Sequence, residues 1–189
     1  AYHKALVIKP DCAEAYKNMG GVLKNLVFKK PNSNLQKIII AILDHKTYAR
    51  PKDISSAAIS LLKFEPALQK VLKQDFKGQP IQFLDDAVLK LSELPLLLKL
   101  MAVCPLADLA VESVLRDIRS SLLSSVSELD GSSEVLRFQS ALALQCFTNE
   151  YVYSHSVREG KTLEALQVSV DRLLSNGEQP SSHSILCLA

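Results

Sequence analysis

The side chains that could do chemistry gather near residue 150. Cys146 and His155 could form a nucleophile and its base, and Glu150 with His155 could form an acid–base pair. Glu150 and His155 are poorly aligned on a helix, and nine residues of helix would hold Cys146 about 13 Å from His155. Only a bend would bring the two together. We therefore expect no catalytic site in this chain.

Three polar residues in the same stretch have a second interpretation. Gln145, Asn149 and Glu150 lie in the most apolar part of the sequence, and polar groups enclosed among apolar ones need hydrogen-bond partners. They either contact a partner domain or ligand, or form hydrogen bonds that fix neighbouring helices. We favour the structural role.

Neither a metal nor a cofactor is indicated by the pattern of residues. The cysteines, Cys12, Cys104, Cys146 and Cys187, are far apart and form no Cys-x-x-Cys pair, so the spacing of a zinc site or a disulfide framework is missing. No glycine-rich loop follows a predicted strand, as a nucleotide cofactor would need. Scattered thiols are typical of the reducing cytoplasm, where we expect the protein.

The charge is unevenly divided along the chain. The net charge is +2, but residues 1–80 carry 14 Lys and Arg against 6 Asp and Glu, and residues 81–189 carry 8 against 14. The basic half could meet phosphate groups, or the two halves could attract each other. Because the basic residues lack interleaved aromatic residues for base stacking, we favour a solvated surface over nucleic-acid binding. The basic residues are Lys24, Lys29, Lys30, Lys37, Lys46, Arg50 and Lys52.

The elements that must position these residues are helices. Six Gly and eight Pro in 189 residues are few for a strand-and-turn protein, and apolar residues recur at helical spacing between proline and glycine breaks. No stretch of about 20 apolar residues could span a membrane. The sequence predicts an all-α fold, a helical array or irregular bundle of about ten helices. A segment at 135–153 is apolar on most sides and is therefore predicted to be the central helix, with Leu142 and Phe147 deeply buried.

The first 27 residues resemble the tetratricopeptide repeat. An aromatic residue, a small residue and a closing proline match the end of one repeat. An aromatic residue, a large residue before a glycine, and a leucine then match the first helix of the next repeat. The matching residues are Tyr2, Ala5, Pro10, Tyr16, Met19, Gly20 and Leu23. The helix is expected to continue to Val27 and to end at Pro31. The alternative is a plain amphipathic hairpin, because the pattern stops where the next second helix should show small residues.

A second resemblance covers roughly residues 1–178. Arg50–Asp53, 57–62, 94–98 and above all the run Gln145-Cys146-Phe147-Thr148-Asn149-Glu150-Tyr151-Val152 are similar to a helical region of certain bacterial multidomain proteins. In those proteins the region joins tetratricopeptide repeats to a class I S-adenosylmethionine-dependent methyltransferase domain. The resemblance implies that the methyltransferase domain would follow residue 189, so no catalytic or cofactor-binding residue is carried over.

These observations predict three segments and a role as scaffold. Residues 1–46 form a partial repeat hairpin, residues 47–178 a helical domain, and residues 179–189 a tail, unstructured to about 184, or the start of a missing element. We expect a non-catalytic scaffold or regulatory domain, a fragment of a longer protein, that binds an adjoining domain or a protein partner. The apolar side of the N-terminal hairpin further predicts a homodimer. A free-standing enzyme with an unrecognised site and weak nucleic-acid binding through the basic half are the alternatives.

Overall fold

The fold is built from helices alone wherever the structure describes the chain. The computed structural model describes residues 9, 12–45, 49–74, 81–129, 131–150 and 156–189. Of these residues 73% are helical and none lies in a strand, which confirms the expected all-α array. The described helices are α2 (Ala13–Leu23), α3 (Ser33–Asp44), α4 (Pro51–Leu62), α5 (Pro66–Val71), α6 (Ile81–Ser92), α7 (Pro95–Val103), α8 (Leu109–Ser124), α9 (Ser133–Thr148), α10 (Val157–Ser175) and α11 (Ser182–Leu188).

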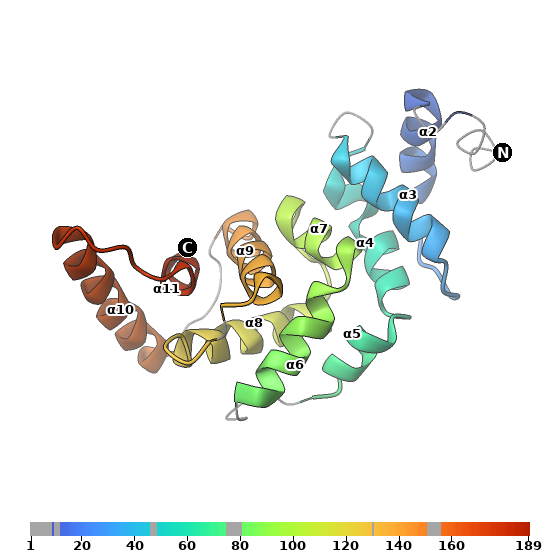
Figure 1. Ribbon diagram of the computed structural model, residues 1–189. Helices are drawn as coiled ribbons and strands as arrows, with labels where there is room; N and C mark the ends of the chain where they lie inside the picture. Colours follow the sequence, from blue (N-terminus) through green and yellow to red (C-terminus); the bar gives the residue numbers. More distant parts are fainter. Residues whose placement is uncertain (1–8, 10–11, 46–48, 75–80, 130, 151–155) are drawn as a thin grey trace.

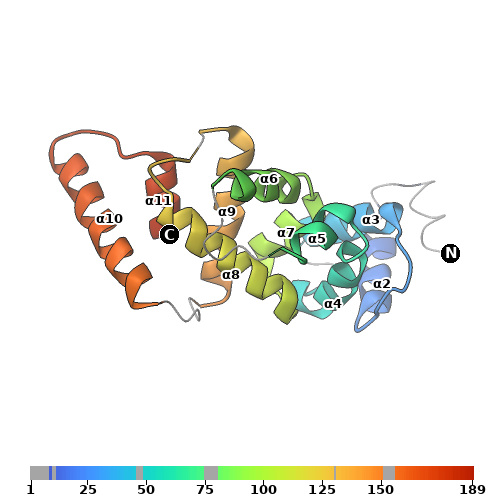
Figure 2. The same ribbon diagram turned by 90° about the horizontal axis from the view of Figure 1, so that it is seen from below.

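The helices form an elongated row. Helix α2 lies at one end, α10 and α11 lie at the other, and α8 and α9 come between the two ends in both views (Figures 1 and 2). Helix α7 packs against α3 and α4 on one side and against α9 on the other. Its residues Leu96, Leu97, Leu100 and Met101 are almost completely enclosed. One hydrophobic core runs from Leu23 to Leu142 through these contacts.

Helix α2 is shorter than its apolar pattern predicts. The expected continuation to Val27 is wrong, because the helix ends at Leu23 and Asn25 adopts a left-handed backbone with φ 58°, which asparagine tolerates better than most residues. The chain then turns back over α4, where the amide of Phe28 donates a hydrogen bond of 2.9 Å to the hydroxyl of Ser60. Val27 is left exposed.

Helix α9 confirms half of the burial prediction. Leu142 is only 5% exposed, but Phe147 is 65% exposed, so its predicted burial is wrong. At about 100° per residue, Phe147 lies some 140° around the helix from Leu142. The side that carries Phe138 and Leu142 faces the core, whereas Leu144 and Phe147 lie on an outer face. The helix is central in position, yet it is not enclosed on all sides.

The end of the chain is helical where we expected a tail. Asn176 and Gly177, with φ 74° at the glycine, end α10 as their residue types predict. The expectation that residues 178–184 are unstructured is wrong from Ser182 onward, because the Ser181 side chain caps a further helix, α11. This helix packs against α9 and α10.

Ion pairs connect the basic half of the chain to the acidic half. Lys63 Nζ lies 2.5 Å from Asp108 Oδ2, and Lys70 Nζ lies 3.6 Å from Asp86 Oδ2. The Lys70–Asp86 pair is exposed on both sides and contributes at most about 1 kcal/mol, whereas Asp108 of the other pair is mostly covered. A third pair, Lys99 with Asp44, joins the same two halves with the charges reversed.

Two phenylalanines of α9 test which side of this helix faces the core. We expect Phe138→Ala to lower the free energy of unfolding by about 3–5 kcal/mol, because Phe138 is fully buried. Phe147→Ala should cost less than about 1 kcal/mol, since most of its ring already contacts water. Urea denaturation followed by circular dichroism measures both values. Equal losses would contradict the orientation of α9.

Candidate functional site

The polar residues singled out in the sequence do not form one site. Asn149, which caps the C-terminus of α9, donates from Nδ2 to Glu112 Oε1 of α8 at 3.3 Å. Glu150 is exposed and has a left-handed backbone with φ 54°. Gln145 is almost fully buried, and neither polar atom of its side chain has a hydrogen-bond partner among the described residues. Asn149 thus connects α9 to α8 through Glu112, whereas Gln145 is buried and Glu150 is exposed.

The described part of the repeat-like segment has the packing of a helical hairpin. Gly20 and Leu23 are buried, and Tyr16 and Met19 are partly buried against the core. Helix α2 packs against α3 and α4. The other three residues of the resemblance, Tyr2, Ala5 and Pro10, lie outside the described residues, as do Tyr151–Tyr153 and His155.

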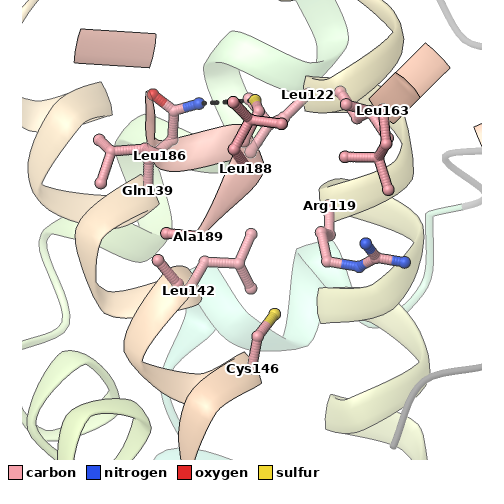
Figure 3. Close-up of a pocket in the computed structure, with 12 residues that line it drawn as sticks. Arg119, Leu122, Gln139, Leu142, Cys146, Leu163, Leu186, Leu188 and Ala189 are labelled. Atoms are coloured by element: carbon pink, nitrogen blue, oxygen red, sulfur yellow. Dashed lines mark hydrogen bonds between the residues drawn. The ribbon is translucent and has the colours of Figure 1, made fainter. Parts of the chain in front are cut away.

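A cavity lies at the opposite end of the row, between α8, α9, α10 and α11. It has a volume of about 270 Å³, and Cys146 and Leu142 of α9 line it together with Arg119 of α8 (Figure 3). Most of the lining is aliphatic. The full set is Arg119, Leu122, Leu123, Gln139, Leu142, Ala143, Cys146, Leu163, Leu186, Cys187, Leu188 and Ala189.

Gln139 holds α11 against this cavity. Its Nε2 donates to Cys187 Sγ at 3.7 Å, and its Oε1 accepts a hydrogen bond from His183 Nδ1. Gln139 and His183 are both buried. With its hydrogen on Nδ1, the imidazole leaves Nε2 as an acceptor, and Nε2 has no hydrogen-bond partner in the described part of the chain. One glutamine amide thus bonds to two residues that stand one helical turn apart on α11.

Burial makes the thiols of this cavity weak acids. It raises the pKa of Cys187 to about 11 and also raises the pKa of Cys146, while the positive charge of Arg119 opposes both shifts. Cys104, in the core, also has a pKa raised by burial to about 11. Because these thiols ionise more readily in the unfolded chain, the protein loses stability as the pH rises above about 9.

Arg119 also faces a carboxylate. Its Nη2 lies 3.5 Å from Glu159 Oε1, with 19% and 12% of the two side chains exposed. Glu159 belongs to a capping box at the start of α10, in which it accepts from the amide of Ser156 at 2.6 Å and its own amide donates to the hydroxyl of Ser156 at 3.2 Å. Burial raises the pKa of Glu159, but hydrogen bonds from Ser156 and Ser120 and the charge of Arg119 outweigh it, so the pKa is lowered.

Sequence reasoning named Leu142, Cys146 and Cys187 of the cavity lining, but it did not predict that they meet. Gln139 and Cys187 are 48 positions apart, and no motif connects them to Arg119. One signal was available: His183 and Cys187 lie four residues apart, which places them on one side of a helix. That signal was lost because the segment was expected to be a tail.

The outer face of α9 is a second surface feature of the same region. Leu144 is 47% exposed and Phe147 is 65% exposed, and they are three residues apart on one ridge of the helix. Arg137 and Ser140 continue this ridge toward the N-terminus of α9 and are also exposed. We call the four residues the α9 ridge.

The comparisons with known proteins give no relative. No family model, curated protein or solved structure matches the chain.

Within the described residues, no group of three or more His, Cys, Asp and Glu side chains could hold a metal ion. In the same part of the chain, no helix has both the length and the apolar character that a membrane crossing requires.

The role of Gln139 can be measured through the reactivity of Cys187. We expect Gln139→Leu to loosen α11, because the variant leaves the buried His183 and the half-buried Cys187 without their shared partner. A return of the Cys187 pKa from about 11 toward its ordinary 9.0 would raise the thiolate fraction at pH 8 about 100-fold. Alkylation of Cys187 by iodoacetamide, followed by mass spectrometry, should accelerate by about tenfold or more.

The neighbouring variant Ser140→Ala is the control, since Ser140 lies on the exposed face of α9. It should leave the alkylation rate of Cys187 unchanged. An unchanged rate in Gln139→Leu as well would mean that the glutamine does not hold α11 in place.

Proposed function

We propose that this chain is a non-catalytic helical scaffold that binds a protein partner or an adjoining enzyme domain. The observation that supports this proposal most directly is the α9 ridge. Helix α9 packs against α6, α7 and α11, so its outer face is presented from a well-supported position. That face nevertheless exposes a leucine and a phenylalanine side by side.

The chemistry of the α9 ridge suits a protein interface. Aromatic residues are enriched at the centre of such interfaces, and polar residues at their rims. Leu144 and Phe147 would supply the centre, with Arg137 and Ser140 on one side and the exposed Glu150 on the other. Single exposed apolar residues are ordinary, but two large ones on the same helical ridge add their apolar areas in one place.

The resemblance in sequence gives this proposal its context. The run from Gln145 to Val152 is similar to the region that precedes a methyltransferase domain in bacterial multidomain proteins, and it includes Phe147 of the α9 ridge. We infer that the scaffold belongs to a protein of this kind and holds its methyltransferase domain in place. We also propose a cytoplasmic location, since all four cysteines are free thiols.

Photo-crosslinking from position 147 tests the interface. A benzoylphenylalanine in place of Phe147 in the intact protein, irradiated in cells, should form adducts with one partner or one adjoining domain, because its ring would lie at the interface. Mass spectrometry identifies the linked residues. The same substitution at Leu109, the most exposed large apolar side chain among the described residues at 85%, is the control and should give no defined adduct. Equal adducts from the two positions, or none from 147, would refute the interface.

A cofactor titration separates the scaffold from an enzyme with an unrecognised site. We expect calorimetry to detect no saturable binding of S-adenosylmethionine to this chain. The reason is that the sequence shows no predicted strand followed by a glycine-rich turn, which would hold this cofactor. Binding in the micromolar range would overturn the assignment as a non-catalytic scaffold.

A further inference from the structure

Helix α9 is exposed along one narrow stripe. Between positions 135 and 148, the four residues of the α9 ridge are exposed and every other residue is buried or half-buried. At about 100° per residue, the four positions fall within an arc of about 80° around the helix axis. Helices α6, α7 and α11 pack against α9, which lies between α11 and α6 in both views (Figures 1 and 2). A stripe this narrow suits contact with one further helix rather than with a broad surface.

The spacing of the α9 ridge matches the way in which helices pack side by side. Its residues Arg137, Ser140, Leu144 and Phe147 are separated by three, four and three positions, which is the a and d spacing of a coiled-coil seam. At about 1.5 Å per residue they extend over about 15 Å of the helix.

A helix is also the element that covers such a stripe at the lowest cost. Its backbone amides and carbonyls are paired with one another, so it can lie on Leu144 and Phe147 without leaving polar groups unpaired. An extended segment lacks this advantage, because the side of a helix offers it no backbone groups to pair with. The apolar centre of the ridge therefore favours a helical partner.

The charge at one end of the ridge indicates what the partner carries. Arg137 is exposed, and among the described residues it belongs to no ion pair. The guanidinium selects a carboxylate by its charge and by its planar fork of donors. Because Arg137 comes one heptad before Leu144, a complementary acidic residue stands one heptad from the partner residue that contacts Leu144.

We propose that the partner of the α9 ridge is a single amphipathic helix of another protein, which lies along α9 with apolar side chains on Leu144 and Phe147 and an acidic side chain on Arg137. An exposed charge at the edge of a small apolar centre steers the encounter of separate molecules, which favours a separate protein over a tethered domain. This inference rests on the scaffold function proposed above and adds the kind of partner to it.

Photo-crosslinking from two ridge positions one heptad apart tests the helix. Benzoylphenylalanine replaces Ser140 in one variant of the intact protein and Phe147 in another, and mass spectrometry identifies the residues linked on irradiation in cells. The two positions are about 10.5 Å apart along α9. A helix covers this distance in about seven residues, so we expect links about seven positions apart in one segment of one other protein. An extended segment would cover it in about three residues.

A charge reversal tests the acidic contact. Arg137→Glu should lower the yield of the adduct from position 147 about fivefold, because a charge pair is lost and like charges then meet. Replacement of the partner's acidic residue by lysine should restore the yield. Lys37→Glu is the matched control, since Lys37 is exposed on α3 in the other half of the row, and it should leave the yield unchanged.

The outcomes distinguish this inference from the scaffold function. Links about three positions apart, or links to unrelated segments, would overturn the partner helix and leave the interface standing. Links to a segment of the same chain would overturn the separate partner, and equal yields in Arg137→Glu and Lys37→Glu would overturn the acidic contact. The absence of adducts from both positions, in variants that circular dichroism shows to be folded, would refute the scaffold interface together with its partner.

Discussion

The need to bury α7 on nearly every side organises the rest of the molecule. Helix α7 has only nine residues, and a helix this short is not stable in water without packing partners. Its leucines point in several directions, so no single neighbour can cover them. Helices α3 and α4 cover one side and α9 covers the other. This arrangement joins the repeat-like start of the chain to its later helices through one hydrophobic core.

The position of α9 follows from that constraint. It gives rise to both the cavity and the α9 ridge. One side of α9 is used by α6 and α7, which take Phe138 and Leu142 into the core. A second side carries Gln139, whose amide attaches α11. The cavity lies beside this attachment, and the α9 ridge is what remains uncovered. The α9 ridge and the cavity therefore lie on different sides of a single helix.

Much of the fold can be predicted from sequence because local rules govern it. Helical spacing of apolar residues places the helices, and Pro51, Pro66 and Pro95 each stand in a first helical turn, where a missing amide hydrogen costs little. Local rules fail where one signal favours a longer helix, another favours its end, and the two differ little in energy. The chain leaves α2 at Leu23 although apolar residues continue to Val27, because Asn25 accepts a left-handed backbone.

The candidate site was harder to predict, for a different physical reason. The sequence of an apolar helix shows that much of the helix surface is suited to burial. It does not show which side of the helix the neighbouring helices will cover. Phe147 and Phe138 look alike in the sequence, and only packing distinguishes them. The cavity is harder still, since Arg119, Gln139 and Cys187 come from three helices and meet only after these helices have packed. The hydrogen bond from Asn149 to Glu112 likewise joins two helices that are 37 positions apart in the sequence.

Helix α10 has a consequence for how the molecule opens. It is 19 residues long, yet Val170 is its one buried residue, and it contacts mainly α8 and α11. Local stability follows the number of buried contacts, so elements with few of them open at a lower free energy than the global unfolding of the domain. The backbone amides of α10 should therefore exchange their hydrogens with water well before those of α7. Such an opening would carry Glu159 away from Arg119 while the core from Leu23 to Leu142 remained folded.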